Sequence, residues 1–307
     1  MKISSVVVIY NSTLIKSDTL TSLLACQKEQ IDITILVWNN GPEFLDEEDI
    51  KTFLFSCKEK GINAKIYQDI RNIALSKIYN FFIDNENFDF ITLLDQDSML
   101  PADYYTKIYP HINEDIITPI IIAEKNGILA QTDPHFYGDV NVMIPEGKVN
   151  MKIDSVMSGL AISRKGINKI KNYRRYVFEE RLAFYGIDSD LFRTINIMKE
   201  NGHHLDIYCT NKIHHSFAMF NSEENKSKFR VMEMFYFQSF IRNEYQKKAK
   251  ASTIYIYLRD FLRTKIDFST AKNLILFSMD NTHPRSRITI NKDITPTHEI
   301  PLPLYLK

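Results

Sequence analysis

Two aspartates spaced one residue apart, Asp95 and Asp97, directly follow a short apolar run over residues 90–94. The run is rich in aromatic and branched side chains, which is typical of a buried strand. Because open α/β sheets bind ligands beyond the carboxyl ends of their strands, both carboxylates are expected at a binding edge. Two adjacent acids are costly without a shared positive group, and a divalent cation that also binds substrate phosphates meets that need. The alternative is a solvated turn in which an aspartate caps the next helix.

A second pair of aspartates, Asp188 and Asp190, stands just before a helical pattern that runs to Gly202. A carboxylate within hydrogen-bond reach of a hydroxyl can take its proton as the oxygen attacks, which makes this pair a candidate for base catalysis. Capping of the helix explains the same residues, and Asp190 in the first turn also suits the helix dipole. Both interpretations stay open from these residues alone.

Two adjacent histidines, His214 and His215, follow a strand-like segment over residues 207–213. Adjacent residues of a strand point to opposite faces, so at most one of the two faces a given pocket. His215 is interpreted either as a partner of a metal or phosphate group or as a structural histidine.

The elements that position these residues follow a regular order in the first hundred residues of the chain. Apolar runs that end in polar turns predict strands, and apolar residues at helical spacing predict the helices between them. The strands are expected at residues 3–9, 31–38, 63–67 and 90–94, and the helices at 17–27, 47–59 and after residue 72. Four such units indicate an α/β fold with a doubly wound, parallel sheet.

Polar clusters follow each of the four predicted strands, at residues 10–12, 39–41, 69–72 and 95–97. Each cluster alone is more often a simple turn. Since the carboxyl ends of parallel strands meet at one edge of a sheet, the clusters together predict a single pocket.

The composition is that of a globular protein, with 307 residues, 44% of them hydrophobic and 25% charged. This length suits one large domain with an appendage, or two domains. The formal net charge of zero argues against general nucleic-acid binding, so no nucleic acid is expected as a partner. The sequence has neither a Walker phosphate loop nor the GxGxxG fingerprint, so a nucleotide must be held in another way.

The three cysteines, Cys26, Cys57 and Cys209, lie far apart and show no ligand spacing. This pattern favours buried thiols in a reducing compartment over disulfides or zinc. There is no signal peptide and no apolar run approaching the ~20 residues of a membrane span, so a cytoplasmic protein is expected.

Several segments, taken in chain order, resemble the signatures of family 2 inverting glycosyltransferases. Within that family they are most similar to the rhamnosyltransferase-like branch, which builds bacterial surface polysaccharides. The resemblance covers roughly residues 3–245 and rests on short signatures in the expected order. The segments lie at residues 8–11, 37–41, 71–80, 93–98, 157–163, 178–190 and 215–216.

The resemblance implies the GT-A fold, the nucleotide-diphospho-sugar transferase type, with a doubly wound mixed sheet. In this fold the acidic pair is a DxD motif. It also implies Mg²⁺ or Mn²⁺ as the cofactor, with Asp97 as the main metal ligand. Asp95 would lie by the donor sugar or ribose and share the metal, and His215 would face the metal and the diphosphate.

On the donor side, the resemblance places Tyr10 and Asn39 in the pocket for the nucleobase. The family usually has aspartate at the position of Asn39. The other donor-binding positions that it implies are Asn11, Asn40, Arg71, Asn72, Asp95 and Gln96.

On the acceptor side, the resemblance makes Asp188 the general base. Ile187 stands where the family often has glutamate. The acceptor-side positions that it implies are Ser158, Gly159, Glu180 and Asp190.

The last part of the chain has two segments, residues 225–250 and 254–266, with apolar and aromatic residues at helical spacing. In the second segment basic residues are interleaved with the aromatic ones. Such helices either pack on the sheet or on a second copy of the chain, or lie in a membrane interface near a lipid-linked acceptor. Residues 281–307 are rich in proline and predict an extended strap with little regular structure. We therefore expect a GT-A domain over residues 1–220 and a helical extension with a tail over residues 221–307.

The sequence thus predicts a metal-dependent inverting glycosyltransferase that is cytoplasmic or peripheral on the inner face of the cell membrane. It would move a sugar, with rhamnose as the candidate, from a nucleotide-diphosphate donor to a hydroxyl of a glycan or lipid-linked saccharide. One alternative is a nucleotidyltransferase, although residues 10–13 lack the glycines that its phosphate loop normally has. The other is a catalytically degenerate protein that binds nucleotide sugars without turnover.

Overall fold

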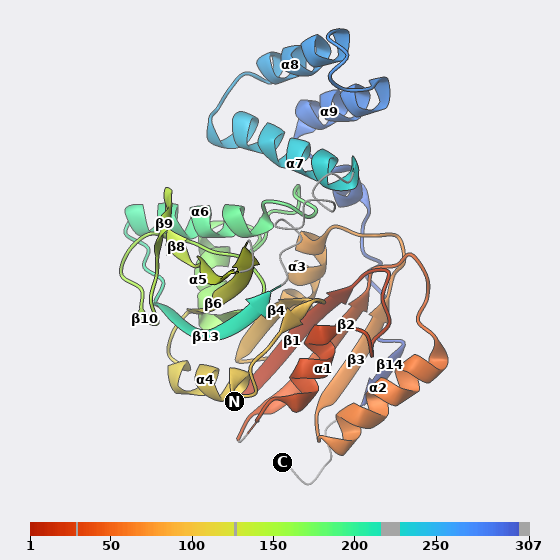
Figure 1. The fold of residues 1–307 in the computed structure, drawn as a ribbon, viewed down its shortest axis with the longest axis vertical. Helices are drawn as coiled ribbons and strands as arrows, with labels where there is room; N and C mark the ends of the chain where they lie inside the picture. The colour runs from red at the N-terminus through yellow and green to blue at the C-terminus, as the bar shows by residue number, and fades with distance from the viewer. Residues whose placement is uncertain (29, 126–127, 216–227, 301–307) are drawn as a thin grey trace.

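A computed structural model describes residues 1–28, 30–125, 128–215 and 228–300, with the side chains of 125 and 215 left out. Its centre is a sheet in which the described strands follow the order β10-β13-β6-β12-β4-β1-β2-β3-β14 (Figure 1). Two further strands extend it, because β5 pairs with β13 and β7 pairs with β6.

The first half of the sheet is parallel, and its strands alternate with helices in the predicted order. The strands are β1 (Lys2–Ile9), β2 (Asp32–Asn39), β3 (Asn63–Gln68) and β4 (Phe90–Asp95). The helices are α1 (Asp18–Ala25), α2 (Glu47–Glu59) and α3 (Leu75–Asn85). The strands and helices expected from the sequence are confirmed here to within a few residues at each end.

The second half of the sheet is mixed. The antiparallel strand β12 (Leu160–Ser163) lies between β4 and β6 (Ile116–Lys125), and β13 (Ile207–His215) runs parallel to β6. Shorter strands are β5 (Ser98–Met99), β7 (Ile128–Asp133) and β10 (Gly147–Lys148), and a small separate sheet holds β8 (His135–Phe136), β9 (Asp139–Met143) and β11 (Ile153–Asp154). The helices are α4 (Tyr104–Ile108), the 3₁₀ turn η1 (Tyr109–His111), α5 (Arg164–Tyr173) and α6 (Ile187–Glu200).

The core lies on both faces of the sheet, as expected for strands covered by helices on either side. In β1, Val6 points into one apolar cluster and Val7 into the other, because successive residues of a strand face opposite ways. The three cysteines are buried free thiols, and burial raises the pKa of each to about 12. The predicted fold class, a doubly wound mixed α/β sheet with a C-terminal helical extension, is confirmed.

The C-terminal helices gather at one end of the molecule, above α6 and α3 in the view of Figure 1. They are α7 (Lys228–Phe240), which continues into the π-helical turn η4 (Ile241–Tyr245), then α8 (Lys250–Leu262) and α9 (Phe268–Asp280). The sequence analysis did not single out α9. Among the described residues, none of the helices combines the length and apolar character needed to cross a bilayer. Large apolar side chains are exposed on α8 and α9, among them Tyr255, Leu262 and Phe268.

The tail returns from these helices along the edge of the sheet (Figure 1). It forms a 3₁₀ turn, η5 (Pro284–Arg287), and then the short strand β14 (His298–Ile300), which pairs antiparallel with β3. The strap predicted from the prolines therefore ends in an edge strand that the sequence did not indicate. The predicted domain boundary near residue 220 falls in residues 216–227, outside the described part of the chain.

Candidate functional site

Backbone hydrogen bonds join the loops that follow the first three parallel strands. The amide of Asn11 donates to Gly41 O at 2.7 Å, and the amide of Asn40 donates to Ile9 O at 2.9 Å. The amide of Asp69 donates to Asn39 O at 3.0 Å. The polar clusters after β1, β2 and β3 are therefore neighbours at the carboxyl edge of the sheet.

The loop after β4 joins them through Tyr10 and Gln96. The Tyr10 amide donates to Gln96 Oε1 at 2.8 Å, and Gln96 Nε2 donates back to Tyr10 O at 3.3 Å. The backbone of Tyr10 is thus fixed, while 44% of the residue stays exposed at this edge. An exposed aromatic ring on a fixed backbone suits stacking against a planar ligand.

Asn39 and Asn40 are buried, and their side chains hold the loop after β2. Asn39 Nδ2 donates to Glu43 O at 2.8 Å, while its Oδ1 accepts from the amide of Gly41 at 3.1 Å. Asn40 pairs with the backbone of Ile73 in both directions, at 3.0 and 2.8 Å. Both asparagines therefore shape the loop at the carboxyl edge of the sheet, and the predicted contact of Asn39 with a nucleobase stays a prediction.

Arg71 and Asn72 follow β3 at the same edge. Arg71 binds Asp69 in a bidentate pair, with Nε to Oδ1 at 2.8 Å and Nη2 to Oδ2 at 2.5 Å, and this pairing keeps the pKa of Asp69 below its usual range. Half of the Arg71 side chain, 51%, is exposed. Asn72 adopts a left-handed backbone with φ of 55° and accepts a hydrogen bond from Arg285 Nη1 at 2.9 Å. The sequence analysis missed Arg285, which lies far along the chain in η5.

Asp95 and Asp97 are half-buried where β4 ends. The turn that carries them is fixed from both sides. From one side, Thr19 Oγ1 donates to Asp95 O and to Ser98 O. From the other side, Oγ of the buried Ser158 lies 2.5 Å from Ser98 Oγ and accepts from the Asp95 amide at 3.4 Å. Ser158 thus holds the acidic turn from β12.

The acidic turn fits a cation that takes further ligands from a substrate. In the part of the chain that the structure describes, no three His, Cys, Asp or Glu side chains converge to hold a metal by themselves. Two carboxylates together with substrate phosphates are the usual ligands of Mg²⁺ in such sites. The backbone of His215 pairs with Ser98 next to the turn, but its side chain lies outside the described set.

Asp188 stands in the first turn of α6, two residues after Gly186, whose φ of +85° starts the helix. Its carboxylate accepts from the Ser189 amide at 2.8 Å. Burial raises the pKa of Asp188 to about 7, helped by the negative charges of Asp154, Asp133 and Asp95, although part of the residue still faces solvent. A carboxylate that titrates near neutral pH is suited to take a proton.

Tyr79 of α3 connects the two acidic groups. The residue is buried, and burial raises the pKa of its hydroxyl well above the usual value. The charges of Asp95 and Asp188 act in the same direction, so both carboxylates lie near this hydroxyl. Asp95 of the acidic turn and the predicted base Asp188 therefore both act on the same buried hydroxyl of α3.

The loop before α6 is held along α3. Asn80 pairs with the backbone of Phe178 at 2.9 and 3.1 Å and donates to Glu180 Oε1 at 3.2 Å. Ser76 Oγ donates to Leu182 O at 2.5 Å. Glu180 therefore lies against α3 rather than on an open surface, in the loop that leads to Asp188.

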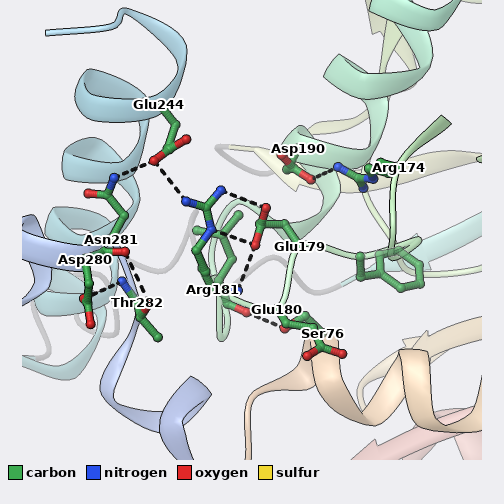
Figure 2. A network of polar contacts seen from close by, with 12 residues as sticks. Ser76, Arg174, Glu179, Glu180, Arg181, Asp190, Glu244, Asp280, Asn281 and Thr282 are labelled. Atoms are coloured by element: carbon green, nitrogen blue, oxygen red, sulfur yellow. Dashed lines mark hydrogen bonds and ion pairs between the residues drawn. The ribbon is translucent and has the colours of Figure 1, made fainter. Parts of the chain in front are cut away.

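Charged side chains tie this loop to the C-terminal helices (Figure 2). Arg181 binds Glu179 through Nε at 2.9 Å and Glu244 of η4 through Nη1 at 2.9 Å. Asp190 accepts from Arg174 Nη1 at 2.6 Å and from the Tyr245 hydroxyl at 2.8 Å. Both carboxylate oxygens of Asp190 have protein partners, so its position favours the structural interpretation.

Gly159 occupies a crowded position in the core. Its φ is +86°, and a Cβ there would come within 2.1 Å of Ile213 Cδ1. Its amide donates to Leu93 O at 2.7 Å. Gly159 therefore lets the chain just before β12 pass close to β4 and to the Ile213 side chain of β13, which sets the place of Ser158.

Two further acids near Asp188 were missed by the sequence analysis. Asp133 ends β7 and pairs with His135 at 3.3 Å, and Asp154 of β11 lies opposite His135 in the small sheet. Burial raises the pKa of Asp154 to about 6. β11 has only two residues, and β7 lacks a pattern of alternating burial, so no local signal indicated that they reach the site.

Comparison with protein-family models finds no match, and comparison with curated proteins finds none either. Among solved structures, the chain is similar to residues 1–349 of S. aureus TarS, with 12% identity over 92% of this chain and 71% of that one, and a TM-score of 0.48. For TarS 1–349 in complex with UDP-GlcNAc, the identity is 11% over 92% of this chain and 72% of that one, with a TM-score of 0.48. For the complex with UDP, the identity is 14% over 95% of this chain and 95% of that one, with a TM-score of 0.45. At these identities and TM-scores the likeness carries no conclusion about activity, which must come from this chain's own residues.

Proposed function

We propose that this protein is a metal-dependent inverting glycosyltransferase that uses a nucleotide-diphosphate sugar as donor. The observation that supports the proposal is that two acidic groups, one at the end of β4 and one at the start of α6, both act on the buried Tyr79 hydroxyl. One is the pair Asp95 and Asp97, and the other is Asp188, whose pKa is raised to about 7. The carboxyl edge at which β4 ends is where open α/β sheets bind ligands.

The donor half of the site is assigned to the loops after β1 to β4. Tyr10 offers an exposed ring for a nucleobase. The half-exposed Arg71 side chain, whose Nε and Nη2 bind Asp69, would offer its Nη1 donors to phosphate oxygens. Asp97 and Asp95, with His215 as a further ligand, would hold Mg²⁺ or Mn²⁺. When bound, the cation supplies Lewis-acid stabilisation of the charge that grows on the leaving diphosphate.

The acceptor half is assigned to the start of α6. In this proposal Asp188 accepts the proton of an acceptor hydroxyl while that oxygen forms a bond to the anomeric carbon. The bond from that carbon to the diphosphate oxygen breaks on the opposite face, so a single displacement inverts the configuration. A base whose pKa lies near neutral pH is ionised often enough to act and still holds the proton well.

The finer assignments rest on the resemblance described above. They are rhamnose as the donor sugar, and a glycan or lipid-linked saccharide of a surface polysaccharide as the acceptor. They also include the division into a transferase domain over residues 1–220 and an extension over residues 221–307. Contact of the extension with a membrane or with a second copy of the chain, and a cytoplasmic location, are proposed from the residue patterns of the chain instead.

A thermal-shift screen tests the donor assignment. Sugars carried on UDP, GDP or dTDP are added with and without Mn²⁺, and a ligand specific for the native state raises Tm. We expect one carrier to raise Tm in a Mn²⁺-dependent way in the wild type and not in Asp97→Ala. No shift with any carrier would contradict the proposal.

The products of a turnover assay then separate the proposal from its alternatives. Release of the nucleoside diphosphate together with a glycosylated acceptor supports a glycosyltransferase. Release of pyrophosphate instead would show a nucleotidyltransferase. Donor binding with no release of either would show a protein that binds nucleotide sugars without turnover.

A further inference from the structure

A cavity of about 370 Å³ lies beside the start of α6. Its walls come from α6, from the small sheet, and from α7 and η4. Ser189, the neighbour of the proposed base, lines it, as does Asp154. Its volume is at the lower end of the range of small-molecule pockets.

Arg193 and two tyrosines form a fixed polar wall in this cavity. Arg193 Nη1 donates to the Tyr137 hydroxyl at 3.0 Å, and its guanidinium lies over the Tyr245 ring at 4.2 Å. The Tyr245 hydroxyl donates to Asp190 at 2.8 Å. Because these contacts set the side chains before any ligand arrives, little ordering entropy would be lost on binding.

The chemistry of the lining matches a sugar ring. Phe237 and Tyr245 present aromatic surface, which suits the apolar C–H face of a pyranose. Asp154, Arg193 and Gln246 present planar polar groups, which suit its ring of hydroxyls. A pocket that combines an apolar floor with a few placed polar groups is typical of specific small-molecule sites.

We propose that this cavity binds a saccharide unit of the acceptor, next to the unit whose hydroxyl faces Asp188. This inference rests on the proposed function and adds the class of ligand and its location. It places acceptor recognition partly on the C-terminal extension, through Phe237, Tyr245 and Gln246. The loops after β1 to β4 supply none of the described residues that line the cavity, so the donor and the acceptor would be recognised by different residues.

Saturation-transfer NMR on the full chain tests the proposal with methyl glycosides of glucose, galactose, mannose, rhamnose and N-acetylglucosamine. The first variant is Gln246→Ala, because Gln246 is exposed and its loss leaves the fold intact. The second is Arg193→Ala, which removes the fixed polar wall. The matched control is Gln238→Ala, an exposed glutamine of α7 that does not line the cavity.

We expect at least one glycoside to bind, and each cavity variant to weaken it by about tenfold, the effect of losing one good hydrogen bond. The control should bind as the wild type does. No binding by any glycoside, or binding that both cavity variants leave unchanged, would overturn the subsite. The thermal shifts produced by the nucleotide sugars are measured on the same proteins. Absence of these shifts would contradict the donor assignment, whereas normal shifts without glycoside binding would contradict the saccharide subsite alone.

Discussion

The ring of Phe237 lies directly against Gly186, so that a Cβ added to this glycine would fall 2.1 Å from Phe237 Cδ2. Gly186 has φ of +85° and precedes the helix that carries Asp188. The first C-terminal helix therefore packs on the segment that positions the proposed base. This contact brings α7 to the proposed acceptor side of the site.

Gly186→Ala should lower both stability and transfer. An alanine in the left-handed region costs about 1–2 kcal/mol, and the clash with Phe237 adds to this cost and displaces Asp188. Urea unfolding and steady-state turnover measure the two effects. The matched control is Gly202→Ala, since Gly202 has φ of +81° and no atom within 4 Å of the added Cβ.

The control should show the backbone cost without the loss of transfer. In the double variant Gly186→Ala, Phe237→Ala the clash is absent, so part of the lost turnover should return. Equal losses of turnover in Gly186→Ala and Gly202→Ala would show that the contact with Phe237 does not position the base.

Asp97→Ala and Asp188→Ala should each abolish transfer and leave the fold intact. Asp97→Ala removes the proposed main metal ligand, and loss of a general base costs about 10²–10⁴-fold. Turnover and far-UV circular dichroism are the measurements. The control is Asp84→Ala, which breaks only a surface pair with Lys171 and should change neither. Near wild-type turnover in Asp188→Ala would refute the base assignment.

Transfer should depend on pH through the ionisation of Asp188. Because the base acts only when ionised, kcat/KM should fall as the pH drops through about 7, the raised pKa of Asp188. Asp154→Asn removes a negative charge that helps to raise this pKa, so the acidic limb should move to lower pH. A pH–rate profile of both proteins measures the shift. A limb that stays in place in Asp154→Asn would mean that the two carboxylates do not interact.

The same ionisation should cost stability above neutral pH. The pKa of Asp188 is about 7 in the folded protein and 3.8 in the unfolded chain. Between these two values the folded state binds more protons than the unfolded state. The free energy of unfolding therefore falls as the pH rises through about 7. A rise of the pKa from 3.8 to about 7 corresponds to about 4 kcal/mol of unfolding free energy, at ~1.36 kcal/mol per pKa unit. Because Asp188 still contacts solvent, we expect a loss of about 1–2 kcal/mol.

Asp188→Asn keeps the shape and removes the charge, so it should raise Tm at pH 8 by a few degrees and by clearly less at pH 5, where the folded protein keeps Asp188 protonated. Thermal unfolding at the two pH values gives the comparison, with Asp84→Asn as the control. A variant that lowers Tm equally at both values would show that the Asp188 carboxylate stabilises the fold in either charge state.

The parts of the site that the sequence predicted all have local signals. An apolar run followed by Asp95 and Asp97 marks a strand end within a few residues, and the same pattern marks the loop of Tyr10. The parallel order of the strands then brings these ends together without any further information. This is why the donor edge could be placed from the sequence.

The parts that it did not predict depend on contacts between distant segments. Arg285 reaches Asn72 across 213 residues, and Tyr245 reaches Asp190 across 55. Nothing in the spacing near either partner marks such a pair. The strands that carry Asp133 and Asp154 likewise show no alternation of apolar and polar residues that would mark them as strands. The acceptor side is thus set by tertiary packing, which local patterns do not encode.

Arg285 is the residue through which the tail connects the C-terminal helices to the donor edge. Its Nη2 binds Glu233 of α7 at 2.8 Å, and its Nη1 binds Asn72 at 2.9 Å. Glu233 is only 4% exposed, and although burial acts to raise its pKa, hydrogen bonds from His283 and Arg285 hold the pKa below its usual value. A buried carboxylate that loses such a partner is left with a charge that is poorly compensated.

Arg285→Met should therefore cost about 3–5 kcal/mol of stability and weaken donor binding, because Asn72 loses its partner at the same time. The control is Arg287→Met, which breaks an exposed pair with Asp280 and should cost at most about 1 kcal/mol. Urea unfolding and the KM for the donor are measured for both. The double variant Glu233→Gln, Arg285→Met should recover stability but not donor affinity, since only the buried charge has been removed. If the double variant recovered both, the contact with Asn72 would have no part in holding the donor loop.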